Sequence, residues 1–161
     1  FMRPKELATD EAKSVDVILH SVDSLESIGE HFDTIVLLQP TSPLRTTDDI
    51  DNAIETFNEN NCESLVSVYE APHSLFWSFD IKGGYLEPFL GKEYLNKRRQ
   101  DLPKLYLPNG AIYISTKESI ENYRGFFTDN THPYIMPPEQ SIDVDTELDF
   151  RIAEILINIV D

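Results

Sequence analysis

Apolar residues recur along the chain with two different spacings, which predict helices and strands in alternation. Helical spacing marks four segments, at residues 10–28, 46–57, 116–123 and 147–160. Short apolar runs that predict strands lie at residues 34–38, 64–69, 111–114 and 134–136. Residues 75–90 alternate around Lys82-Gly83-Gly84, a pattern typical of a β-hairpin. Strands that alternate with helices predict an α/β fold with a mostly parallel sheet.

Residues that favour helix ends stand beside two of the predicted helices. Thr9 or Asp10 is expected to cap the first helix, and Gly29 to end it. Thr46 or Thr47 is expected to cap the second helix. These local signals agree with the apolar spacing, so the helix assignments do not depend on periodicity alone.

Composition narrows the class of protein. The chain has 161 residues, 40% of them hydrophobic, which suits a single globular domain spanning residues 1–161. A formal net charge of −16 argues against nucleic-acid binding by a broad basic face, but not against a small phosphate ligand. Cys62 is the one cysteine, and no long apolar span is present. We therefore expect a cytoplasmic protein that makes no membrane contact.

The first candidate site follows the strand predicted at residues 34–38, whose unbroken apolar run indicates a strand covered on both faces. The run ends in Gln39-Pro40-Thr41-Ser42-Pro43-Leu44-Arg45, where two prolines stiffen a loop that carries an amide, two hydroxyls and a guanidinium. Ligands of open α/β sheets bind beyond the carboxyl ends of strands, so this loop can recognise a hydroxyl-rich or phosphorylated ligand. The alternative is a rigid connection whose hydroxyls cap the next helix.

The second candidate site is Ser141-Ile142-Asp143-Val144-Asp145-Thr146. In an extended segment Asp143 and Asp145 point to the same side, and two adjacent carboxylates repel unless a cation lies between them. Magnesium bound by one or two carboxylates and by substrate phosphates fits this pattern. The alternative is that Asp145 or Thr146 caps the last helix, a role that leaves Asp143 free.

A third candidate segment is basic. Arg98-Arg99-Gln100-Asp101-Leu102-Pro103 precedes Pro108-Asn109-Gly110, and an arginine here suits the carboxylate of an acidic sugar. The run 97–99 can equally be a solvated loop. Other chemistries lack support: the four histidines have no metal-ligand spacing, Cys62 has no histidine near it in the sequence, and no glycine-rich phosphate loop is present.

Together these motifs resemble the acylneuraminate cytidylyltransferase family, in order and nearly from end to end. The matching segments are Arg3-Pro4-x-x-Leu7-Ala8-x-Asp10, Leu38 to Arg45, Arg98 to Pro103, Asn109 to Ile114, and Ser141 to Asp149. The resemblance implies a Rossmann-like nucleotide-diphospho-sugar transferase fold, a three-layer sandwich in which residues 75–107 form a protruding excursion for dimerisation. It also implies transfer of CMP from CTP to the anomeric hydroxyl of a nine-carbon acidic sugar, with release of pyrophosphate.

The resemblance also implies roles for particular residues. Asp143 and Asp145 would be the catalytic residues and would hold Mg²⁺, and Arg3 would lie near the nucleotide. Arg99 would contact the sugar carboxylate. The other residues implied to bind substrate are Gln39, Thr41, Ser42, Asn109, Tyr113, Phe126 and Phe127.

Two departures from the family pattern bear on function. The chain starts after the phosphate-binding loop and the first strands of the family, which predicts an exposed apolar sheet face and no turnover by this chain alone. Leu107 stands where some relatives carry an arginine. N-acetylneuraminic acid is the expected sugar; alternatives are legionaminic or pseudaminic acid, or a non-catalytic sugar-binding or dimerisation module.

Overall fold

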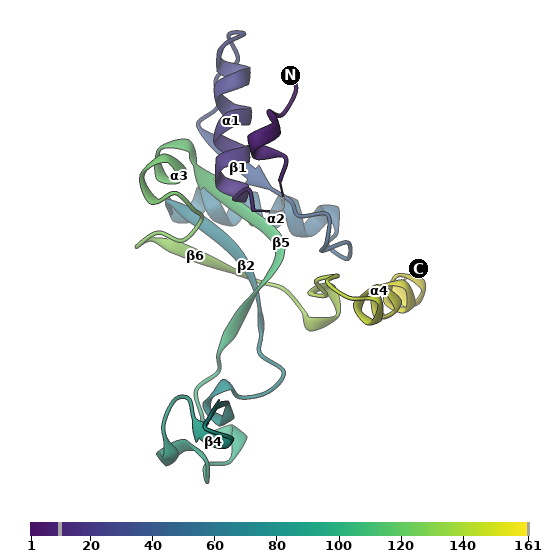
Figure 1. Cartoon of the computed structure of the whole chain (residues 1–161). Coiled ribbons are helices and arrows are strands. Elements are labelled where there is room, and N and C mark those ends of the chain that lie inside the picture. Colours follow the sequence, from purple (N-terminus) through teal and green to yellow (C-terminus); the bar gives the residue numbers. More distant parts are fainter. Residues whose placement is uncertain (10, 161) are drawn as a thin grey trace.

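A four-stranded sheet forms the centre of the computed structural model, which describes residues 1–9 and 11–160 (Figure 1). The strand order is β1-β5-β2-β6, with bounds Thr34–Leu37 for β1, Tyr106–Thr116 for β5, Ser64–Glu70 for β2 and Thr131–Ile135 for β6. β2 and β6 are parallel, whereas β5 runs antiparallel to both β1 and β2. Three of these strands therefore share one direction, and β5 is reversed between two of them.

Helices cover both faces of this sheet. On one face α2 (Thr47–Asn60) packs Ala53 and Phe57 against Leu65 of β2. On the other face α1 (Ser14–Glu26) and α3 (Lys117–Tyr123) pack against Val66. Neighbouring residues of β2 thus enter opposite cores, because side chains of a strand alternate between its faces. The predicted three-layer α/β sandwich is confirmed.

The helix ends agree with the sequence in α2 but not at the start of α1. The hydroxyl of Thr46 accepts a hydrogen bond from the amide of Asp49, and the carboxylate of Asp49 accepts one from the amide of Thr46. For α1 the predicted cap Thr9 was wrong: the helix begins at Ser14 with Lys13 at its N-cap position, and the Thr9 carbonyl accepts a hydrogen bond from the amide of Ala12 in a preceding turn. The alternative cap Asp10 lies outside the described residues.

Two of the elements that expose apolar side chains are β1 and the last helix. The prediction that β1 is covered on both faces was wrong: Ile35 and Leu37 pack against one core, whereas Val36, on the other face, is 39% exposed. Helix α4 (Glu147–Val160) extends away from the sheet (Figure 1). Its exposed apolar residues include Leu148, Phe150, Ile152, Ile155 and Ile157. Val36 is thus an exposed apolar residue on a sheet face, whereas the apolar surface of α4 is helical and was not predicted.

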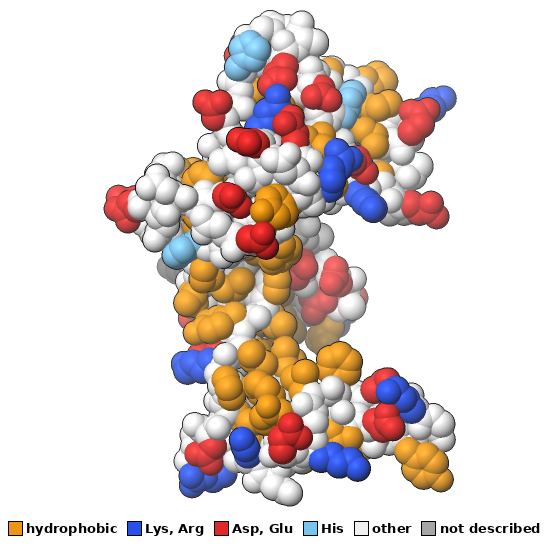
Figure 2. All heavy atoms as spheres, turned by 90° about the vertical axis from the view of Figure 1, so that its left-hand side faces the viewer, with side chains coloured by type: hydrophobic (Ala, Val, Ile, Leu, Met, Phe, Trp, Pro, Cys, Tyr) orange, Lys and Arg blue, Asp and Glu red, His pale blue; other side chains and the backbone are white. Residues whose placement is uncertain are grey.

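The predicted β-hairpin forms the end of a protruding arm, which we define as residues 75–105. Strands β3 (Phe79–Lys82) and β4 (Tyr85–Pro88) pair through a turn at Gly83 and Gly84. The outer parts of β2 and β5 pair beyond the body of the sheet and carry the arm away from it (Figure 1). Figure 2 shows apolar side chains gathered over the lower half of the molecule, where the arm joins the body.

The short elements complete the described chain. They are 3-10 turns at Lys5–Leu7, Leu75–Trp77, Lys92–Tyr94, Arg99–Asp101 and Pro138–Gln140. None of the helices in the described part of the chain is both long and apolar enough to cross a membrane.

Candidate functional site

Two loops that are distant in sequence meet at one end of the sheet. Residues 39–45 follow β1, whereas residues 137–146 follow β6, at the opposite edge of the strand order. The amide of Val144 nevertheless donates a hydrogen bond to the carbonyl of Thr41, at 2.8 Å. The chain after β6 therefore runs back past Val68 of β2 and Asn109 of β5 to reach the first loop, and it unites the first two candidate sites.

Gly110 of β5 is the point on which these loops converge. Its φ of +73° is a left-handed conformation that favours glycine. A Cβ atom built there would lie 2.6 Å from Oε1 of Gln39, 2.8 Å from Oγ of Ser42 and 3.5 Å from Oδ2 of Asp143. The amide of Gln39, the hydroxyl of Ser42 and the carboxylate of Asp143 therefore surround one small residue.

Arg45 stiffens the first loop from within. Its Nη1 donates hydrogen bonds to the carbonyl oxygens of Gln39 and Ser42, at 2.6 and 2.7 Å. Burial lowers the pKa of this guanidinium below its ordinary value. Ser42 is fully buried and Gln39 half-buried, whereas Thr41 is exposed. Gln39 and Thr41 are thus the predicted ligands of this loop that solvent can reach.

The two candidate metal ligands, Asp143 and Asp145, are exposed. In the described residues neither makes an ion pair, and no cluster of three or more metal-binding side chains is found. Thr146 and Asp149 cap α4. The Asp149 carboxylate accepts a hydrogen bond from the amide of Thr146, and the Thr146 hydroxyl accepts one from the amide of Asp149. Hydrogen bonds from Thr146 lower the pKa of Asp149. Both carboxylates of the candidate pair remain free for a cation.

Tyr113 lies at the edge of the core, within reach of the charge of Asp143. Burial raises the pKa of Tyr113, and the negative charge of Asp143 raises it further. The ring of Tyr113 packs on Phe126, with a centroid separation of 5.2 Å. Phe126 is 8% exposed and belongs to the core, whereas Phe127 is 61% exposed. The structure therefore separates two neighbouring phenylalanines that the sequence places together.

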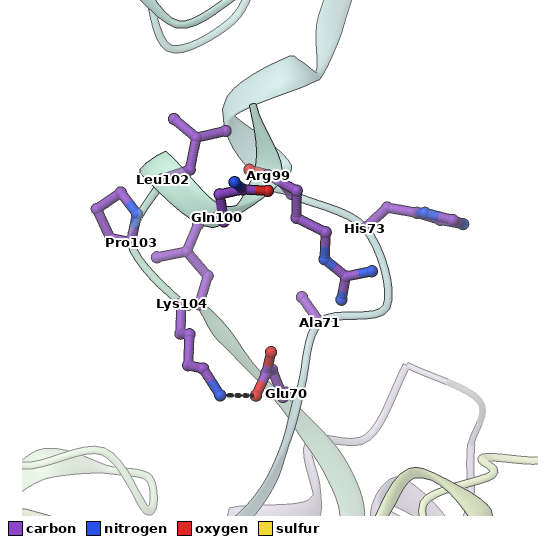
Figure 3. Close-up of a pocket in the computed structure, with 10 residues that line it drawn as sticks. Glu70, Ala71, His73, Arg99, Gln100, Leu102, Pro103 and Lys104 are labelled. Atoms are coloured by element: carbon purple, nitrogen blue, oxygen red, sulfur yellow. Dashed lines mark hydrogen bonds and ion pairs between the residues drawn. The ribbon is translucent and has the colours of Figure 1, made fainter. Parts of the chain in front are cut away.

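Arg99 lies in the arm, near the outer end of β2. It lines a pocket of about 310 Å³ together with Glu70, His73 and Lys104 (Figure 3). The Lys104 ammonium donates to the Glu70 carboxylate at 2.7 Å. Arg99 also lines a second pocket of about 390 Å³ with Met136 and neighbouring prolines, on the side of the 137–146 segment. Its side chain therefore lies at the base of the arm and borders the start of the 137–146 segment.

The remaining two candidates differ in accessibility. Arg3 is exposed on the N-terminal segment, which contacts α1 through an edge-to-face packing of Phe1 on His20. The contacts of the described residues do not join Arg3 to the loop junction. Asn109, by contrast, is 2% exposed and lies inside the junction.

Sequence reasoning missed Ser67, which is fully buried in β2. It bonds Asn109 and the amide of Ile112, at 2.5 and 2.7 Å. The available signal was a serine within the apolar run 64–69, because a buried hydroxyl requires a hydrogen-bond partner.

Comparison with known proteins gives close sequence relatives. N-acylneuraminate cytidylyltransferase of Streptococcus agalactiae serotype III is 41% identical over 151 residues, 92% of this chain and 35% of that protein. CMP-N,N'-diacetyllegionaminic acid synthase of Legionella pneumophila is 30% identical over 165 residues, 99% of this chain and 68% of that protein. The chain thus spans about a third of the first relative and two thirds of the second. No family profile matches the chain.

A solved structure shares the fold. The structure of CMP:2-keto-3-deoxy-manno-octonic acid synthetase complexed with CTP superposes with a TM-score of 0.59 at 12% identity, over 94% of this chain and 70% of that one. The predicted nucleotidyltransferase fold is therefore confirmed. With the sequence relatives, the fold and the ordered motifs agreeing, the chain belongs to the acylneuraminate cytidylyltransferase family.

Proposed function

We propose that the protein transfers CMP from CTP to the anomeric hydroxyl of N-acetylneuraminic acid. The hydroxyl oxygen forms a bond to the α-phosphorus of CTP and gives up its proton to water, and the bond from this phosphorus to the pyrophosphate oxygen breaks. Family membership supports the reaction class. The single structural observation that carries the proposal is the convergence of Gln39 and Asp143 on Gly110.

This convergence suits the chemistry of phosphoryl transfer, which needs alignment and charge neutralisation more than a covalent intermediate. The loop 39–45 offers the accessible amide of Gln39 and hydroxyl of Thr41 to the hydroxyl groups of a sugar. Arg45 holds that loop rigid through two backbone carbonyls, so its donors are oriented before the ligand binds. The carboxylate of Asp143 lies near the same point, with Oδ2 3.5 Å from the position of a Cβ atom on Gly110, and we infer that it faces the phosphates of CTP.

Magnesium is the proposed cofactor, and the donor set fits it. Asp143 and Asp145 are exposed carboxylates at alternate positions, and neither has a cationic partner in the described residues. A Mg²⁺ ion bound by one or two carboxylates takes its other ligands from water and from phosphate oxygens. When bound, the ion would supply positive charge against the CTP phosphates.

The main experiment measures pyrophosphate release from CTP by the intact protein with Mg²⁺ and N-acetylneuraminic acid, and with legionaminic and pseudaminic acids in parallel. We expect release with the first sugar, whereas release with another alone would reassign the substrate. Asp145→Asn should abolish release and leave the circular dichroism unchanged. Asp51→Asn is the control, since Asp51 is exposed on α2. No pyrophosphate release with any of the three sugars would favour a non-catalytic module.

Arg99 is proposed to bind the sugar carboxylate. The adjacent Arg98 is already paired with Asp101 at 2.8 Å, whereas no ion pair engages Arg99 in the described residues. Arg99→Ala should raise the KM for the sugar about thirty- to a hundredfold, the effect of one charged hydrogen bond, and leave the KM for CTP unchanged. Arg98→Ala is the matched control. Equal changes in both KM values would contradict the assignment.

A homodimer built through the arm is also proposed. The exposed apolar side chains of the arm include Phe79, Ile81, Leu86 and Phe89, an unfavourable surface for a monomer. Ile81→Asp should convert the dimer to a monomer in analytical ultracentrifugation. Ile28→Asp is the control, because Ile28 is 73% exposed at the end of α1 and Ile81 is 71% exposed. We also propose a cytoplasmic location, in which the Cys62 thiol would stay reduced.

A further inference from the structure

The strand pair β2–β5 contains a wide bulge beside the proposed site. Val66 faces Tyr113, but Val68 faces Pro108, so residues 109–112 of β5 all stand opposite Ser67. The buried hydroxyl of Ser67 accepts a hydrogen bond from the amide of Ile112 at 2.7 Å and donates one to Oδ1 of Asn109 at 2.5 Å. One serine therefore holds both ends of the bulge that presents Gly110 to the site.

Asn109 extends this network to both loops of the junction. Its Nδ2 donates to Oγ of Ser141 at 2.9 Å and contacts Sδ of Met136 at 3.3 Å. Its backbone carbonyl accepts a hydrogen bond from Oγ of Ser42 at 2.9 Å. Its Oδ1 accepts bonds from Ser67 and from the amide of Ala111. Since the side-chain amide is buried and its donors and acceptor are engaged inside the protein, it has no free group for a substrate.

We propose that Asn109 is a positioning residue for the transfer reaction, an inference that rests on the proposed function. By holding Ser42 and Ser141 on one rigid bulge, it sets the distance between loop 39–45 and segment 141–146. Gln39 lies in the first of these and Asp143 in the second. This assignment differs from the direct substrate contact that family resemblance implies for Asn109 and Ser42.

The physical reason is that transfer depends on alignment. A misplacement of about 1 Å away from the reacting groups can cost about a hundredfold in rate. A buried polar network whose members are all satisfied holds one geometry, whereas a network that loses a member leaves unpaired groups that rearrange. Loss of Asn109 or Ser141 should therefore change the rate of the chemical step more than the binding of either substrate.

Two variants of the intact protein test this role against a matched control. Asn109→Ala and Ser141→Ala remove the bridge, whereas Ser115→Ala removes an equally buried hydroxyl of β5 that bonds the Glu63 carbonyl at 3.0 Å, away from the junction. In both bridge variants kcat should fall about ten- to a hundredfold, with both KM values changed less than about threefold. Ser115→Ala should lower the melting temperature and leave kcat unchanged.

Hydrogen exchange gives a readout that does not require activity. The amide of Val144 bonds the Thr41 carbonyl across the junction, so its exchange should accelerate at least about tenfold in the bridge variants but not in Ser115→Ala. If Asn109→Ala does not fold, Ser141→Ala carries the test. Unchanged Val144 exchange with unchanged kcat would overturn the positioning role, as would an increase in the sugar KM without a fall in kcat. If the wild-type protein releases no pyrophosphate, the proposed function is wrong. Hydrogen exchange at the Val144 amide then tests by itself whether Asn109 holds the two loops together.

Discussion

Replacing Gly110 with alanine tests the close approach of β5 to loop 39–45. Two costs contribute. A residue with a side chain at φ +73° costs about 1–2 kcal/mol, because Cβ crowds the following carbonyl. The new Cβ would also lie 2.8 Å from Oγ of Ser42, and a small-to-large change in a packed site typically costs about 1–3 kcal/mol.

The neighbours of Gly110 differ in their ability to move. Oε1 of Gln39, 2.6 Å from the new Cβ, is the far end of a flexible side chain and can rotate away. Oγ of Ser42 cannot, since Ser42 is fully buried and donates to the Asn109 carbonyl at 2.9 Å. Gly110→Ala should therefore lower the free energy of unfolding by about 2–5 kcal/mol. The displaced Gln39 should also reduce kcat.

Gly29→Ala is the matched control. Gly29 has φ +93° at the end of α1, and no atom lies within 4 Å of the Cβ that alanine would add. This variant should lose only the backbone cost, about 1–2 kcal/mol, and keep its kcat. Urea denaturation of both variants of the intact protein measures the difference. If Gly110→Ala costs no more than Gly29→Ala, the loops do not converge on Gly110 as described.

Three further outcomes are expected. Lys117→Met removes the 2.6 Å contact between Nζ and the Glu26 carboxylate, a contact that raises the pKa of Lys117 in the folded protein. A lysine whose pKa is higher in the folded than in the unfolded protein stabilises the fold at pH values below its unfolded pKa, about 10.4. The wild type should therefore be more stable than the variant at about pH 8 and lose this advantage above about pH 10.4, as measured by urea midpoints. Leu65→Ala should cost about 2–5 kcal/mol because Leu65 is fully buried, whereas Leu148→Ala, at 66% exposure on α4, should cost less than about 0.5 kcal/mol in the same assay. Thr46→Ala should cost about 1 kcal/mol through loss of the α2 cap, measured by thermal denaturation.

Local patterns in the sequence determined the elements and the kinds of chemistry available. The turn at Gly83-Gly84, the cap at Thr46 and the apolar spacing of the helices all act over a few residues, so they are legible without the fold. The two segments that form the candidate site could be recognised from the sequence for the same reason. A proline-stiffened polar loop follows β1, and two aspartates at alternate positions precede α4.

The start of α1 shows where local reasoning failed. Thr9 is an acceptable cap by residue type, but its carbonyl closes a turn with Ala12 before the helix begins at Ser14. Likewise, the apolar run of β1 predicted a strand covered on both faces, although Val36 is exposed. Burial of a strand depends on which elements pack against it, and the composition of the strand itself does not specify those elements.

Only the tertiary structure decided how the site is assembled. The reversed strand β5 lies between β1 and β2, and its bulge places Asn109 and Gly110 between loops about a hundred residues apart in sequence. Adjacent residues of one type also acquired different roles: Arg98 pairs with Asp101 while Arg99 faces a pocket, and Phe126 is buried while Phe127 is exposed. The sequence determines which donors and charges exist, whereas their mutual distances follow from strand order, register and long-range packing, which no short segment encodes.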